Sequence, residues 1–188
     1  MTSCADGYRV ELIDVVPLHV KRAARLAGVT AWQGDARELP LPDESVDAVL
    51  LLGPLYHLAE RADRVRTLAE VVRVVRPSGL VAAATISRYL AVHDTIYLRS
   101  YLLEEQRKMA DSAAVDGVIL SSNSGFTAYC HDPDEVPVEF ADASLPEAAR
   151  YGLEGPFSLY GDINDWLDDP DRRALMRDAQ RRLESVPS

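Results

Sequence analysis

The chain has 188 residues, of which 47% are hydrophobic and 27% are charged, a composition that fits one ordinary globular domain with a sizeable core. Its formal net charge of −10 argues against a nucleic-acid partner, which needs clustered Lys and Arg, and against an anionic membrane surface. The two cysteines, Cys4 and Cys130, are too few for a disulfide framework, and no apolar run approaches the ~20 residues that span a bilayer.

Four aliphatic runs in the first half of the chain predict strands that alternate with helical patterns. The predicted strands are Tyr8–Ile13, Val29–Gln33, Val46–Leu52 and Leu80–Ile86. One helix is expected from Pro17 to Gly28, and a second from Glu60 to Arg76, where Pro77 stops it before a Ser78-Gly79 turn. The order β-α-β-β-α-β predicts an α/β fold with a mostly parallel sheet and helices on both faces.

Beyond Ser87 the pattern becomes less regular. We expect a helix over Tyr89–Ala110, a polar loop over Asp111–Gly125 and a short strand over Phe126–His131. The remaining predictions are a helix at Asp132–Ala143, a last strand at Ala148–Leu153, and two helices at Asp162–Leu167 and Asp171–Glu184.

Three stretches of the first 90 residues carry a resemblance to a known family. These are VELIDVVPLHVKRA, QGDARELPLPDESVDAVLLLGPLYHL and LAEVVRVVRPSGLVAAATIS, and together they resemble the core of a class I S-adenosylmethionine-dependent methyltransferase. The later FTAYCHDPDEV and LDDPDRRALM are similar to a bacterial small-molecule branch of that family. The resemblance implies a Rossmann-like fold, S-adenosylmethionine as cofactor, and methyl transfer to an O, N or C nucleophile of a small molecule.

The resemblance also implies how the chain is organised. We expect a single domain over residues 1–188, with a cofactor-side core at 1–88, a substrate region at 89–160 and C-terminal helices at 161–188.

One part of the family pattern is not found. The family begins with a central strand and an Asp-x-Gly-x-Gly-x-Gly loop, whereas here only seven residues precede the strand Tyr8–Ile13 that resembles the family's second strand. The fold is therefore expected to be truncated at the N-terminus, and also before the family's last strand at the C-terminus. Two rows of unpaired backbone groups would be exposed, which offers a route to self-association and predicts weak or no cofactor binding by this chain alone.

Two acidic residues follow predicted strands, at the sheet edge where open α/β folds bind ligands. Asp14 in that position favours hydrogen bonds to both ribose hydroxyls, although an Asp there also caps helices. By resemblance, Asp35 would accept from the adenine amino group and the Ala36 amide would face the ring, while an Asp bonded within its own turn is the alternative. Val15 would pack on the adenine face or in the core.

The third predicted strand ends at the other candidate site residues. By resemblance, the backbone of Leu52 and Gly53 would pass beside the methionine part of the cofactor, and Tyr56 and His57 would face the substrate. His57 is a candidate general base for a hydroxyl or amine nucleophile, but a His at the start of a helix is more often a packing residue.

Other functions are less consistent with the sequence. No metal site is expected, since the four histidines lack ligand spacing, and no Gly-x-Ser-x-Gly supports a hydrolase. A nicotinamide-dependent Rossmann oxidoreductase is compatible with Asp14 but not with the Gly-Pro-Leu-Tyr-His stretch. A non-catalytic remnant that binds a partner is the other alternative. Residues 1–7 have no signal-peptide pattern, so we expect a cytoplasmic location.

Overall fold

The computed structural model describes residues 7–120, 127–153, 161 and 163–183. The chain divides into two compact units, one of Met1–Ala84 with Asp142–Leu145 and one of Thr85–Ala141 with Pro146–Ser188. The first break lies near the expected boundary at residue 88. The assignment of the whole chain to a single domain stays a prediction.

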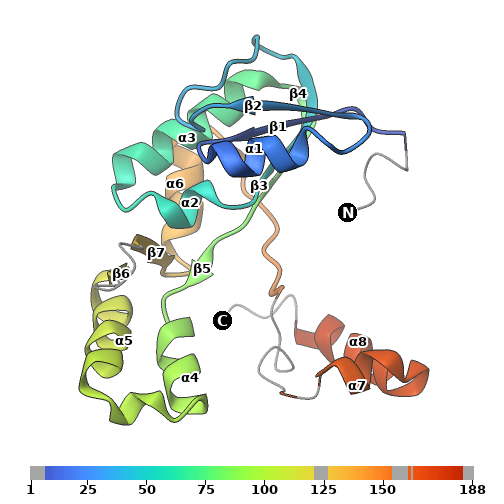
Figure 1. Ribbon diagram of the computed structural model, residues 1–188. Coiled ribbons are helices and arrows are strands. Elements are labelled where there is room, and N and C mark those ends of the chain that lie inside the picture. Colours follow the sequence, from blue (N-terminus) through green and yellow to red (C-terminus); the bar gives the residue numbers. More distant parts are fainter. Residues whose placement is uncertain (1–6, 121–126, 154–160, 162, 184–188) are drawn as a thin grey trace. The chain divides into compact units, whose positions relative to one another are not determined.

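The first unit contains the predicted α/β alternation (Figure 1). Its elements are β1 (Val10–Asp14), α1 (Pro17–Ala23), β2 (Val29–Gln33), β3 (Val46–Leu51), α2 (Pro54–His57), α3 (Arg61–Val74) and β4 (Val75–Ala83). The order expected from the sequence is confirmed, with the four-residue helix α2 as an addition. Pro17 opens α1 because its ring fixes a helical φ and its missing N–H would have had no partner there.

The strands of this unit form two separate parallel pairs. β1 pairs with β2, from Val10 opposite Val29 to Asp14 opposite Gln33. β3 pairs with β4, and Ala48 lies opposite Leu80. Within the described residues, no strand joins β1 to β3. In the part of the chain that the structure describes, one edge of β1 and one edge of β3 therefore have no strand partner.

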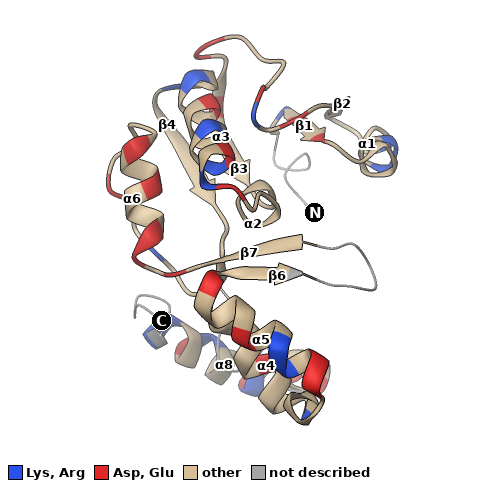
Figure 2. Ribbon diagram, turned by 90° about the vertical axis from the view of Figure 1, so that its left-hand side faces the viewer, with Lys and Arg blue, Asp and Glu red and all other residues tan. Residues whose placement is uncertain are grey.

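The core of the first unit lies between α3 and the β3–β4 pair. α3 buries residues at helical spacing of three and four, namely Arg64, Thr67, Leu68, Val71 and Val74. Figure 2 shows acidic and basic positions interspersed along the ribbon of α3.

The end of α3 differs from the prediction. The helix stops at Val74 and β4 begins at once with Val75, rather than after a turn at Ser78. Arg76 precedes Pro77 and is therefore disfavoured in helical conformation, whereas Val75 can pair with Val46. The register shifts at this point, and a Cβ at Gly79 would lie 2.8 Å from the carbonyl oxygen of Asp47, so only glycine fits.

α1 is also shorter than predicted. It ends at Ala23, and the chain continues through tighter turns in which the Leu26 N–H donates to the Ala23 carbonyl at 2.9 Å. Gly28 has a φ of 77°, the left-handed conformation that turns the chain into β2.

The second unit combines short strands with helices. Its elements are β5 (Ile86–Ser87), α4 (Leu90–Tyr97), η1 (Ser100–Leu102), α5 (Glu104–Asp116), β6 (Val118–Leu120), β7 (Thr127–His131), α6 (Glu135–Asp142), α7 (Ile163–Asp168) and α8 (Pro170–Leu183). β7 pairs in parallel with β5 and antiparallel with β6. The predicted strand at 126–131 and the predicted helices corresponding to α6, α7 and α8 are confirmed within the described residues.

Three predictions for this unit are wrong. The single helix over Tyr89–Ala110 is broken where Arg99 takes a left-handed φ of 56°. The loop predicted from Asp111 instead continues α5 to Asp116 and then forms β6, while residues 121–126 lie outside the described residues. Residues 148–153 form no strand, and Leu153 remains 77% exposed.

Among the described residues, the helices are too short or too polar to traverse a lipid bilayer.

Candidate functional site

The carboxyl ends of β1 and β2 border a depression on the first unit. It has a volume of about 350 Å³ and is lined by Val15, Gln33 and Gly34. Val15 is 60% exposed, so it belongs to this surface and not to the core. The Gln33 amide donates to the Val15 carbonyl at 3.4 Å and spans the two strand ends. Val15 was expected here from the sequence, whereas the side chain of Gln33 was missed.

Asp14 ends β1 beside this depression. Its Oδ1 accepts the Val16 N–H at 2.8 Å, and its Oδ2 lies 2.9 Å from Nδ1 of His19. An ionised carboxylate only accepts hydrogen bonds, so His19 is the donor in this pair. The first bond closes a turn just before α1 and does not cap the helix, because the N-cap of α1 is Val16 and no side chain caps it. The capping role that the sequence offered as an alternative for Asp14 is therefore wrong. Each carboxylate oxygen retains a second acceptor site that a ribose hydroxyl could use.

Asp35, two residues beyond β2, is held by Arg37. The guanidinium donates from Nη2 to Oδ2 at 2.6 Å and from Nε to Oδ1 at 3.0 Å, and the Arg37 backbone N–H donates to Oδ1 at 2.9 Å. The side-chain hydrogen bond from Arg37 is the largest cause of a lowered Asp35 pKa. Asp35 therefore stays charged, with part of its acceptor capacity already used. The following residue, Ala36, is half-buried.

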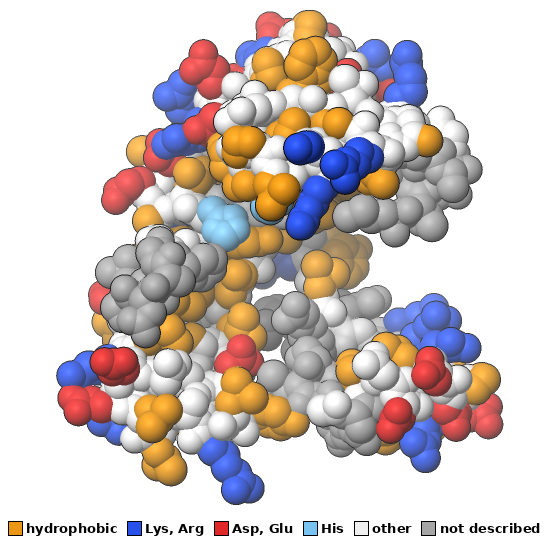
Figure 3. Space-filling model, in the orientation of Figure 1, with side chains coloured by type: hydrophobic (Ala, Val, Ile, Leu, Met, Phe, Trp, Pro, Cys, Tyr) orange, Lys and Arg blue, Asp and Glu red, His pale blue; other side chains and the backbone are white. Residues whose placement is uncertain are grey.

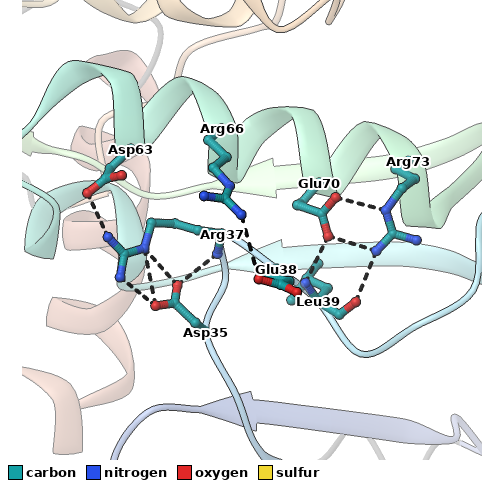
Figure 4. Close-up of polar contacts among 8 residues, drawn as sticks. All are labelled: Asp35, Arg37, Glu38, Leu39, Asp63, Arg66, Glu70 and Arg73. Atoms are coloured by element: carbon teal, nitrogen blue, oxygen red, sulfur yellow. Dashed lines mark hydrogen bonds and ion pairs between the residues drawn. The ribbon is translucent and has the colours of Figure 1, made fainter.

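The crossover after Asp35 is attached to α3 by further polar contacts (Figure 4). Arg37 Nη1 donates to Asp63 at 2.7 Å, and the Leu39 N–H donates to Glu70 at 2.8 Å. Arg73 donates to both Glu70 and the Leu39 carbonyl. The hydrogen bond from Arg73 is the largest cause of the lowered pKa of Glu70. These contacts fix where β2 ends relative to α3.

The residues predicted for the methionine and substrate end lie after β3. Leu52 is 61% exposed, and its carbonyl accepts the Tyr56 hydroxyl at 3.3 Å. Gly53 caps the short helix α2, which carries both Tyr56 and His57. The two rings are 4.9 Å apart and tilted by 56°. Tyr56 is thereby held against the end of β3, whereas His57 is exposed.

The surface around α1 is unusually apolar for a solvent-facing helix. Val16, Leu18 and Leu26 are between 38% and 52% exposed. Figure 3 shows hydrophobic side chains beside a basic cluster on this face of the molecule.

Residues 2–83 match the model of a family described as a methyltransferase domain. This range contains both strand pairs, α3, and every site residue named above. Over these residues the chain is similar to a methyltransferase domain.

Curated relatives agree with this assignment. A probable S-adenosylmethionine-dependent methyltransferase of Mycobacterium tuberculosis is 36% identical over 98 residues, which are 45% of this chain and 34% of that protein. A fatty-acid O-methyltransferase of Mycolicibacterium smegmatis is 46% identical over 59 residues, 31% of this chain and 20% of that protein. The matched part thus spans about a third or less of these relatives' length.

Solved structures support the fold. A methyltransferase of Methanosarcina mazei superposes with a TM-score of 0.56 at 20% identity, covering 80% of this chain and 73% of that one. A putative methyltransferase of Haloferax volcanii, solved with the Trm112 methyltransferase activator, gives 0.55 at 21% identity, covering 93% and 68%. The Rossmann-like α/β class expected from the sequence is confirmed.

Proposed function

We propose that this chain takes part in S-adenosylmethionine-dependent methyl transfer to an O, N or C nucleophile of a small molecule. The observation that carries the proposal is the depression lined by Val15, Gln33 and Gly34, located at the strand ends of a methyltransferase domain. Its volume of about 350 Å³ is within the usual range for small-molecule sites.

In this proposal the depression receives the adenosine part of the cofactor. Val15 offers an apolar surface for the adenine ring, and Asp14 and Asp35 offer acceptors on either side. In this arrangement Asp14 accepts from ribose and Asp35 accepts from the adenine amino group beside the Ala36 amide. Because Arg37 keeps Asp35 ionised, that acceptor remains available down to acidic pH.

The cofactor supplies the methyl group when it is bound. The chain itself would orient the methyl acceptor, because alignment of the two reacting groups can lower the reaction barrier by several kcal/mol. The backbone of Leu52 and Gly53 would lie along the methionine part. Tyr56, fixed by its bond to the Leu52 carbonyl, would shape the substrate end, and His57 would accept a proton from the nucleophile if one must leave.

A small-molecule acceptor is supported by two observations. The net charge of −10 disfavours a nucleic acid, and one relative is named a fatty-acid O-methyltransferase. A cytoplasmic location remains part of the same proposal.

The adenosine site can be tested by saturation-transfer NMR with S-adenosylhomocysteine as the probe. We expect the adenine and ribose protons to receive saturation and the amino-acid protons to receive little. Val15→Asp should weaken the signal about fivefold or more because it places a charge where the ring would pack. Leu153→Asp, an exposed leucine of the second unit, is the matched control.

Two outcomes would contradict the proposal. One is an equal loss of the saturation-transfer signal in Val15→Asp and in Leu153→Asp. The other is the absence of saturation transfer to the adenine protons at millimolar S-adenosylhomocysteine. Submicromolar binding of S-adenosylmethionine by calorimetry would contradict only the expectation that this chain binds weakly on its own.

A non-catalytic role as a binding partner is the second candidate function. It is favoured by the unpaired edges of β1 and β3, which are potential association surfaces. A methyl-transfer assay on the chain together with its binding partner distinguishes the two candidates.

A further inference from the structure

Of the three described residues that line the depression at the ends of β1 and β2, Gln33 carries the one polar side chain. Beside it lie the apolar side chain of Val15 and the backbone of Gly34, whose N–H already donates to the Asp14 carbonyl at 3.2 Å. Gln33 is exposed at the carboxyl end of β2. A ligand in the depression would therefore meet the Gln33 amide as the polar side chain of this lining.

The contact with Val15 determines the orientation of this amide. Nε2 of Gln33 lies 3.4 Å from the Val15 carbonyl oxygen. A carbonyl oxygen only accepts hydrogen bonds, so the NH2 end of the amide must face it, because the reversed amide would place two acceptor oxygens together. In the part of the chain that the structure describes, the second N–H of Nε2 and the oxygen Oε1 have no protein partner. Both remain available to a ligand.

The available groups of Gln33 match one edge of adenine. A glutamine amide can pair with adenine through two hydrogen bonds, in which Oε1 accepts from the amino group N6 and Nε2 donates to the ring nitrogen N7. The amino group has two hydrogens, so its second hydrogen stays free for Asp35. The ring nitrogen N1 stays free for the Ala36 amide. Gln33 therefore adds to the contacts of the proposed adenosine site without competing with them.

We propose that Gln33 is a specificity-determining residue, which selects adenine by pairing with its N6 and N7 groups. The inference rests on the proposed function, because adenosine must occupy the depression for this pairing to form. A 6-oxopurine has an oxygen where adenine has its amino group, and this oxygen would face Oε1 as a second acceptor. The Val15 carbonyl holds the amide in the orientation that disfavours such a base.

The test compares adenosine with 7-deazaadenosine, in which a C–H group replaces N7 and removes the acceptor for Nε2. Saturation-transfer NMR titrations of the full chain give the dissociation constants of both nucleosides. We expect the wild type to bind 7-deazaadenosine about fivefold more weakly than adenosine, because one hydrogen bond is lost. Gln33→Met keeps a side chain of similar length without the amide, so it should bind the two nucleosides equally.

Gln180 of α8 provides a matched control. Its Nε2 donates to the Gly152 carbonyl at 2.7 Å, so it too is a glutamine whose amide is bonded to a backbone oxygen. Gln180→Met should keep the preference of the wild type for adenosine. The side-chain amide nitrogen resonance of Gln33 is a second readout, which should shift when adenosine is added and much less when 7-deazaadenosine is added.

A preference for adenosine that Gln33→Met abolishes and Gln180→Met retains would support the proposal. Equal affinity of the wild type for the two nucleosides, or the same preference in the wild type and in Gln33→Met, would overturn it. If Val15→Asp still weakens adenosine binding in that case, the proposed function stands. If the wild type binds neither nucleoside at millimolar concentration, the proposed function fails and this inference fails with it.

Discussion

The β1–α1–β2 and β3–α3–β4 parts of the first unit share one pattern but differ in packing. In the second part, α3 covers the sheet and Leu55, Leu68, Val71 and Val74 are at most 1% exposed. In the first part, among the described residues, Ala23 alone is a buried hydrophobic residue, while Trp32 is 47% exposed.

The difference lies in how much of each strand is covered. Aliphatic strands such as β1 are suited to neighbours on both edges and cover on both faces, yet among the described residues β1 has one strand neighbour, β2, and one helix, α1, in contact. The predicted adenosine side of the site therefore rests on the weakly packed part. The residues predicted for the substrate side, after β3, rest on the well-packed part.

The largest effect is expected from shortening a buried side chain in the well-packed part. Leu68→Ala should lower the free energy of unfolding by about 2–5 kcal/mol, because the residue is fully buried. Leu18→Ala in α1 should cost less than about 0.5 kcal/mol, because Leu18 is 52% exposed. Urea denaturation of both variants measures the contrast, and equal losses would contradict it.

A smaller effect is expected from adding one methyl group. A Cβ at Gly79 would lie 2.8 Å from the Asp47 carbonyl oxygen and 2.9 Å from that of Arg76, so Gly79→Ala must displace backbone at about 1–3 kcal/mol. At Gly34 the nearest atom, at 2.9 Å, belongs to a side chain and not to the backbone: it is the Cγ2 methyl group of Ile13. Gly34→Ala should therefore lower the thermal unfolding temperature clearly less than Gly79→Ala. A larger decrease in Gly34→Ala would contradict this expectation, because it would show that the backbone around β1 is the more rigid one.

The smallest effect concerns Arg37, which ties the two parts together. Its removal in Arg37→Gln should raise the lowered pKa of Asp35, measured by carboxyl-carbon NMR. A carboxyl group whose pKa is lowered by folding stabilises the protein above its unfolded pKa of about 4, and that contribution disappears as pH falls through the folded value.

The stability difference between wild type and Arg37→Gln should thus be present at pH 7 and shrink in acid. It should be small, because both side chains are more than a third exposed and solvent screens the pair. Arg182→Gln, which removes the exposed pair with Asp178, is the control and should leave the pKa of Asp35 unchanged. An unchanged Asp35 pKa in Arg37→Gln would contradict the conclusion that Arg37 lowers this pKa.

The sequence predicted the fold best where a short local pattern is enough to determine the structure. The strands β1, β2 and β3 follow from aliphatic runs ended by Asp, Gly or Pro, and Asp14 and Asp35 were found because they follow such runs. The break at Arg99 was missed because the apolar spacing continues across it. The prediction of a strand at 148–153 was wrong, and among the described residues no strand pairs with this segment.

The contacts that define the site depend on tertiary structure. Arg37 reaches Asp63, which is 26 residues away, and the Gln33 side chain reaches the Val15 carbonyl across two strands. Neither partner is implied by sequence spacing. The roles of Tyr56 and His57 at the substrate end remain predictions.

The most direct test of the central claim is residue-resolved hydrogen exchange of the free chain. If β1 has one unpaired edge, the amides of Leu12 and Asp14 should exchange slowly and those of Glu11 and Ile13 rapidly. Ala48 and Leu50 in β3 should likewise exchange faster than Leu51. Uniformly slow exchange along β1 and β3 would contradict the account, because it would show that both edges are already paired.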